Sequence, residues 1–248
     1  MRIVAEGVSK GSDGIPLPVR TESFETGRVT IAEAEVGDHP TVLALVLSGR
    51  MVPDTGSVTI TGGSPSADGR GSLDGSAGAA LLRERIALVD APDVSEPAAD
   101  LLLRDVVKEE LMYAGRSTSR ATVEQTIADA GAAEFARVRV ADVPAALRVR
   151  LLAELAAFRP GVRGLVLTQP DRHGGDPRDW LDVALDLAER DFAVLVVTGY
   201  AAAEIVRPLL PVPTAASALP TAPPDTTAAS AAPSTPTQPD HDPEGESA

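Results

Sequence analysis

The sequence has no cysteine, only three histidines and only seven aromatic residues among its 248 residues. Without thiolates, a disulfide scaffold, a cysteine nucleophile and a thiolate metal site are all excluded. The three histidines are scattered along the chain, which argues against a histidine-rich metal centre. With so few aromatic side chains, the core must be built from Val, Leu, Ile and Ala.

Positive charge is scarce as well. The chain has 22 Lys and Arg against 36 Asp and Glu, for a formal net charge of −14. Because phosphate backbones are bound by positive surfaces, this balance argues against nucleic acid as a partner.

Long apolar runs are also missing. No segment reaches the roughly 18 apolar residues that cross a bilayer, so no direct membrane span is expected. The N-terminus has no apolar signal region and reaches an acid at Glu6. We therefore expect a protein that is cytoplasmic, or that is bound to the inner face of a membrane through a partner.

Residues 211–248 differ in composition from the rest of the chain. They contain nine of the 21 prolines and no Lys or Arg. Five acids leave this segment at −5 and residues 1–210 at −9: Asp225, Asp240, Asp242, Glu244 and Glu246. With few large apolar side chains, the segment cannot offset its ordering entropy by burial. We expect a disordered, acidic Pro/Ala/Thr-rich tail that either only solvates the protein or serves for docking.

Within residues 1–210, short apolar runs alternate with amphipathic stretches. Strands are expected at residues 2–8, 28–34, 57–61, 86–89, 164–167 and 193–198, and helices at 41–50, 101–114, 122–130, 145–158 and 179–191. The glycine-rich stretch 61–80 is expected to be a flexible loop or insertion. Strands separated by helices of this length indicate an α/β fold with right-handed crossovers.

The order of these elements, together with several short motifs, resembles the nucleotide-binding subunit of ABC transporters over about residues 1–207. The motifs that carry the resemblance are residues 27–31 (GRVTI), 41–49 (TVLALVLSG), 53–58 (PDTGSV), 165–170 (LVLTQP), 176–177 (DP) and 194–198 (VLVVT). The resemblance implies a P-loop NTPase-like sheet with flanking helices. It also implies one domain over residues 1–210, with a small helical subdomain at about 96–145.

The family's phosphate loop corresponds to residues 33–41 (EAEVGDHPT), in which Gly37 is the only glycine. Its phosphate-binding lysine corresponds to His39, its magnesium-binding hydroxyl to Pro40, and its second hydroxyl to Thr41. Gly37, His39 and Thr41 are therefore the candidate nucleotide-binding residues. The acids Glu33, Glu35 and Asp38 would repel a triphosphate.

The family's Walker B motif ends in a magnesium-binding Asp and a water-polarising Glu, which correspond here to Thr168 and Gln169. Gln169 can orient a water by hydrogen bonding, as glutamine does in some GTPases, but it cannot act as a general base. Asp171 is either a displaced metal ligand or a solvated loop acid. No other catalytic residue and no firm metal ligand is expected.

At three further positions, the sequence also lacks the functional residues that are typical of the family. The signature motif corresponds to residues 143–147 (VPAAL), which keep neither its serine nor its glycines. Ala91 replaces the Q-loop glutamine, and Gly199 replaces the switch histidine. His173 lies in a loop that in this family faces a partner subunit, although an ordinary surface loop explains it equally well.

Three hypotheses follow. The first is a degenerate, non-hydrolysing ABC-type subunit that acts as a regulatory or structural partner of a membrane permease or of a homologous ABC subunit. The second is a weak, divergent ATPase that uses ATP and magnesium through Thr41, Gln169 and Asp171. The third is a soluble interaction module that uses its acidic tail. The transported substrate, the identity of the permease and the choice between homodimer and heterodimer are left open.

Overall fold

The computed structural model describes residues 1–35, 39–62 and 75–211. Residues Met1–Leu210 form one compact unit that holds every element named below. The predicted tail at 211–248 lies outside the described residues apart from Pro211. No helix of the described residues is both long enough and apolar enough to cross a membrane.

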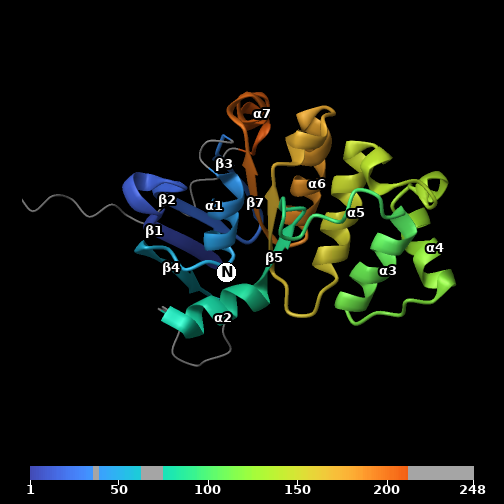
Figure 1. Ribbon diagram of the computed structural model, residues 1–248, viewed down its shortest axis with the longest axis horizontal. Helices are drawn as coiled ribbons and strands as arrows, with labels where there is room; N and C mark the ends of the chain where they lie inside the picture. The colour runs from blue at the N-terminus through green and yellow to red at the C-terminus, as the bar shows by residue number, and fades with distance from the viewer. Residues whose placement is uncertain (36–38, 63–74, 212–248) are drawn as a thin grey trace, which may run out of the picture. The chain divides into compact units, whose positions relative to one another are not determined.

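The strands divide between two sheets (Figure 1). A parallel sheet has the order β3-β7-β6-β5, with β3 at Arg28–Glu33, β7 at Ala193–Thr198, β6 at Gly164–Thr168 and β5 at Ile86–Val89. An antiparallel sheet has the order β2-β1-β4, with β2 at Leu17–Glu25, β1 at Arg2–Lys10 and β4 at Thr55–Thr61. The α/β fold with a parallel sheet is as predicted, whereas the separate antiparallel sheet was not foreseen.

Helices cover the parallel sheet. Before β5 lie α1 (Pro40–Leu47) and α2 (Gly75–Arg85), and after it come α3 (Leu103–Tyr113), α4 (Arg120–Asp129), α5 (Ala145–Ala157), α6 (Pro177–Glu189) and α7 (Tyr200–Val206). Helices α3 and α4 fall in the interval predicted to be a helical subdomain. They contact each other, and α3 also contacts α5.

The strands of the parallel sheet contribute alternate residues to two hydrophobic clusters, as a strand buried on both faces does. In β5, Ala87 and Val89 pack with α3 to α6 in one cluster. Ile86 and Leu88 join the other, which contains α1 and the antiparallel sheet. Leu43 of α1 belongs to this second cluster, so α1 is packed between the two sheets.

Every predicted strand and helix is present, with ends that differ from the prediction by at most three residues. Strand β2 was missed because its sequence LPVRTESFE contains a proline and three charged residues. Proline is tolerated in β2 because it is an edge strand, paired only with β1.

The prediction of a loop over residues 61–80 was wrong at both ends of that stretch. Thr61 belongs to β4, and α2 already begins at Gly75. The alanine and leucine residues that follow favour helix, and Leu82 is buried in the core. Residues 63–74 lie outside the described residues. The short helix α7 was also missed.

Candidate functional site

The carboxyl ends of the four parallel strands meet at one edge of the sheet, the edge at which open α/β sheets bind their ligands. The residues that follow the strands are Glu35 beyond β3, Asp90 beyond β5, Gln169 beyond β6 and Gly199 beyond β7. Because the four strands run parallel, these residues, which include the predicted Gln169, lie at the same edge of the sheet.

Two predicted acids meet at the start of α7. The backbone N–H of Tyr200 donates to Glu35 Oε1 at 2.7 Å. Asp171 accepts from the hydroxyl of Thr198 at 2.7 Å and from the N–H of Gly199 at 3.4 Å. A Cβ at Gly199 would lie 3.3 Å from Glu35 Oε1 and 3.4 Å from Asp171 Oδ2. Both carboxylates thus lie next to Gly199 and accept hydrogen bonds from the backbone N–H groups of Gly199 and Tyr200 at the start of α7.

Asp171 is therefore not a solvated loop acid. It lies in a 3-10 helix at Pro170–His173, is partly buried, and bonds to the end of β7. The sequence could not reveal this contact, because Asp171 and Thr198 are 27 residues apart.

The described part of the predicted phosphate loop adds little positive charge to this edge. Glu33 forms an ion pair with Arg207, which neutralises that arginine. His39 is exposed, precedes α1 in a left-handed conformation with φ of 44°, and does not cap the helix with its side chain. Thr41 is the second residue of α1 and is partly buried. Gly37 and Asp38 lie outside the described residues.

Thr168 is the last residue of β6, and Gln169 follows it directly. Gln169 adopts a left-handed conformation with φ of 48°, and its N–H donates to Val197 O at 2.7 Å. Its side chain makes no hydrogen bond with any residue that the structure describes. The Thr168 hydroxyl is buried and likewise has no partner among the described residues.

A second group of polar residues, centred on Asp90, is buried behind this edge. Arg148 of α5 donates twice to Asp90, from Nε to Oδ2 at 3.0 Å and from Nη2 to Oδ1 at 2.7 Å. The side chains of Arg148 and Asp90 are only 3% and 5% exposed. This bidentate pair ties the end of β5 to the helix that follows the predicted signature motif.

Arg172 extends the group. Its Nη1 donates to the carbonyl of Asp90 at 2.6 Å and to that of Thr168 at 2.9 Å. Its Nη2 lies 3.1 Å from Asp90 Oδ1 and 3.0 Å from Glu96 Oε1. Asp90 has a φ of 53°, a conformation that costs a non-glycine residue free energy. The arginine contacts hold the strand end in this conformation.

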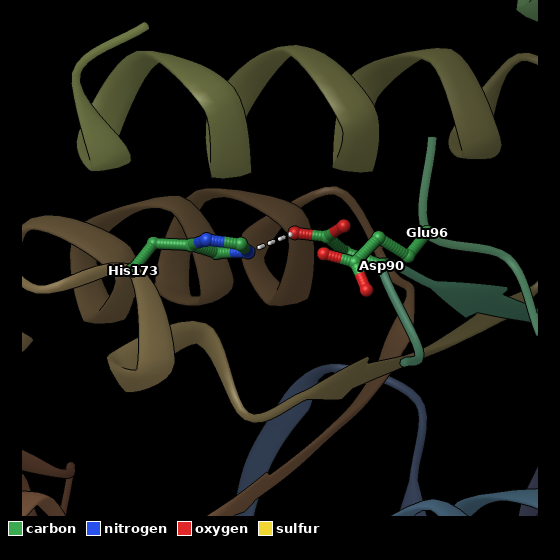
Figure 2. A group of neighbouring side chains, drawn as sticks. All are labelled: Asp90, Glu96 and His173. Atoms are coloured by element: carbon green, nitrogen blue, oxygen red, sulfur yellow. Dashed lines mark hydrogen bonds and ion pairs between the residues drawn. The ribbon is translucent and has the colours of Figure 1, made fainter. Parts of the chain in front are cut away.

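Three members of this group could in principle ligate a metal. Figure 2 shows the imidazole of His173 pointing at the Asp90 carboxylate, with Glu96 beside it, and their potential ligand atoms all lie within 4.8 Å of one another. Both carboxylates already contact guanidinium groups, Asp90 those of Arg148 and Arg172 and Glu96 that of Arg172. A divalent cation would be repelled by those two positive charges, so the donor set does not fit a metal.

His173 instead takes part in the buried network. Its Nε2 donates to Asp90 Oδ2 at 2.9 Å, since an ionised carboxylate can only accept. The side chain is 20% exposed. An ordinary surface loop therefore does not describe this position.

The network determines how Asp90 titrates. Burial by itself raises the pKa of Asp90, but the hydrogen bonds from His173 and Arg148 and the nearby guanidinium charges outweigh it. The pKa of Asp90 therefore lies well below its ordinary value, and the carboxylate is ionised at neutral pH.

Of this group, only His173 was singled out from the sequence. An acid directly after the apolar run IALV was the one available signal for Asp90. Nothing in the sequence connected it with Arg148, 58 positions away, because only the packing of α5 against β5 and β6 brings the two together.

The fold is similar to that of solved ABC transporter ATP-binding proteins. A nucleotide-free ATP-binding cassette from an ABC transporter superposes with a TM-score of 0.59 at 15% identity, with 85% of each chain covered. An ATP-binding subunit of an ABC transporter gives 0.55 at 14% identity, covering 83% of this chain and 82% of that one. CbiO1 from Clostridium perfringens, part of the ABC transporter complex cbiONQ, gives 0.53 at 16% identity, covering 79% and 77%.

No protein-family model matches the sequence, and the comparison with curated proteins found no match. At these identities the similarity shows an ABC ATPase-like fold and no more.

Proposed function

We propose that this chain is a non-hydrolysing relative of the ABC ATP-binding subunits and serves as a structural or regulatory partner in a membrane transport assembly. The observation that carries the proposal is the pair of carboxylates, Glu35 and Asp171, bonded at the start of α7. They stand at the sheet edge where a nucleotide's phosphates would have to be held.

The residues at this edge do not fit MgATP. A triphosphate needs positive charge and inward-facing donors. The sequence has His39 in place of the phosphate-binding lysine, and Arg207 already pairs with Glu33. A carboxylate repels a nearby phosphate charge. Glu35 and Asp171 together therefore disfavour nucleotide binding at this edge.

The two residues that could assist hydrolysis, Asp171 and Gln169, are also poorly suited to it. Asp171 accepts hydrogen bonds from Thr198 and Gly199, so a metal would have to displace both donors. Gln169 cannot remove a proton from water. These contacts disfavour the weak ATPase, whose residues would be Thr41, Gln169 and Asp171.

The decisive measurement is nucleotide binding and turnover by the purified full chain. We expect no saturable binding of MgATP by calorimetry up to the millimolar range. Phosphate release should equal that of a protein-free control, and Thr41→Ala should leave it unchanged. Phosphate release above the control that Thr41→Ala abolishes, while the matched Thr118→Ala on the α3–α4 loop retains it, would overturn the proposal.

A gain-of-binding variant tests the physical reason directly. Glu35→Gln combined with Asp171→Asn removes two negative charges while keeping side-chain size. If these carboxylates exclude the phosphates, a fluorescent ATP analogue should bind the double variant detectably, although weakly. An equal lack of binding by wild type and double variant would mean that the absent lysine alone accounts for the loss.

The role in an assembly rests on the fold and on the complex to which CbiO1 belongs. Co-expression with the membrane protein encoded nearest to this chain should carry it into the membrane fraction. If it stays in the soluble fraction with every such candidate, the hypothesis of a soluble interaction module is favoured.

A further inference from the structure

A pocket of about 290 Å³ opens to solvent on the helical part of the molecule, between α3 and α4. Its wall opposite the two helices is residues 136–137, fixed by hydrogen bonds from Leu103 N to Val138 O at 2.9 Å and from Arg104 N to Ala136 O at 3.1 Å. These bonds join the wall to the first turn of α3, so the pocket is preformed.

Positive charge surrounds this pocket in a chain whose net charge is −14. Four cationic side chains line it, together with two acids, and all six residues are exposed: Arg104, Lys108, Arg120, Arg137, Asp105 and Glu124.

The two acids are already engaged. Glu124 pairs with Arg120 at 2.7 Å, and Asp105 lies 3.6 Å from Arg104. Within the described parts of the chain, no carboxylate lies within ion-pair distance of Lys108 or Arg137. The pocket therefore presents two uncompensated positive charges.

The interior of the pocket is apolar. Val123 and Ile127 of α4 face it, and both are nearly fully buried at 7% and 1% exposed. Ala136 completes the apolar lining. A ligand that fits must pair negative charge at the rim with a small apolar group inside.

We propose that this pocket binds an acidic segment of a partner protein. One apolar side chain of the segment enters against Val123 and Ile127, and flanking carboxylates pair with Lys108 and Arg137. This site shares no residue with the sheet edge that carries Glu35 and Asp171, so the proposal does not depend on whether the chain hydrolyses ATP.

The size of the pocket favours a peptide over a small molecule. Small-molecule sites generally enclose about 300–1,000 Å³ and bury most of the ligand, whereas this pocket is at the lower limit and open. A single apolar anchor surrounded by a polar rim is typical of protein–protein contacts.

The test uses the full-length protein and fluorescein-labelled peptides that carry a central Leu, Val or Phe between paired glutamates. We expect saturable binding by fluorescence anisotropy that weakens as salt rises, because exposed charge pairs are screened. Peptides with glutamine in place of each glutamate should bind at least tenfold more weakly.

Lys108→Glu and Arg137→Glu should each weaken peptide binding at least tenfold, and the double variant should abolish it. The matched control is Arg139→Glu, the same reversal at an exposed residue that does not line the pocket. Circular dichroism and thermal unfolding verify that each variant is folded. Binding that is absent for every acidic peptide, or that falls equally in Arg139→Glu, would overturn the proposal, as would equal binding of the glutamine peptides.

Discussion

Several buried polar contacts converge on Asp90. Both of its carboxylate oxygens accept hydrogen bonds from Arg148, and His173 donates to one of them. Removing one partner of such a pair leaves a buried charge uncompensated, which generally costs about 3–5 kcal/mol. The network therefore holds the end of β5 in place, and removing one of its members should strongly destabilise the fold.

The lowered pKa of Asp90 predicts a particular loss of stability in acid. An unfolded aspartate has a pKa of about 3.9, so Asp90 stabilises the fold above roughly pH 4. This contribution disappears as the pH falls from there toward the lower pKa of the folded protein. Over that window the free energy of unfolding should fall by about 1.4 kcal/mol per pH unit from this group alone.

Asp90→Asn should remove that part of the pH dependence and destabilise the protein at neutral pH. Urea unfolding between pH 7 and pH 2 measures both effects. Asp105→Asn controls for the loss of one negative charge, since Asp105 is exposed on α3. Equal slopes below pH 4 for wild type and Asp90→Asn would show that the carboxylate is not stabilised by the network.

At the scale of a single element, the pairing of strand β4 with β1 depends on a glycine. The register between β1 and β4 shifts between Glu6 and Ser9. On the β4 side lies Gly56, with φ of +72°. A Cβ at Gly56 would lie 2.2 Å from the carbonyl oxygen of Glu6. Both the backbone conformation and the close approach therefore require glycine here.

Gly56→Ala should be far more damaging than Gly131→Ala. Gly131 has the same φ of +72°, but a Cβ there would have nothing within 4 Å. The left-handed conformation costs alanine about 1 kcal/mol, which both variants share. The clash with backbone should destabilise Gly56→Ala by at least about 2 kcal/mol more, as measured by urea unfolding. Equal losses in the two variants would mean that β4 moves away from β1 at little cost.

At the scale of the whole molecule, the members of both hydrophobic clusters that the structure describes all lie within residues 1–210. We therefore expect a chain truncated after Leu210 to keep its stability, with a Tm within about 2 °C of the full chain, since 1 kcal/mol corresponds to about 2–4 °C at this size. Scanning calorimetry measures the difference.

A second truncation, after Gly199, provides the control. It removes α7 together with the buried Ala202, Ala203 and Val206, and it should lower the Tm markedly. A similar loss from the truncation after Leu210 would mean that residues 211–248 contribute to the packing of the domain.

The strands and helices of this fold could largely be predicted from the sequence. Runs such as IALV and AVLVVT are apolar on both faces, which only a covered parallel strand accommodates, and the stretches between them have helical periodicity. Elements without such a pattern were missed. Strand β2 contains charges and a proline, and α7 has only seven residues.

The sequence by itself determined which chemical groups the sheet edge receives. These are glutamates and a histidine in the predicted phosphate loop, the threonine that ends β6 and the glutamine that follows it. Only the tertiary structure decided their partners. Glu35 meets the start of α7 at a separation of 165 residues, and Arg148 meets Asp90 at 58. Local patterns reflect propensity and periodicity, which neighbouring residues determine, whereas these contacts depend on how distant elements pack. The basic pocket between α3 and α4 likewise arises from that packing, in a chain whose overall composition is acidic.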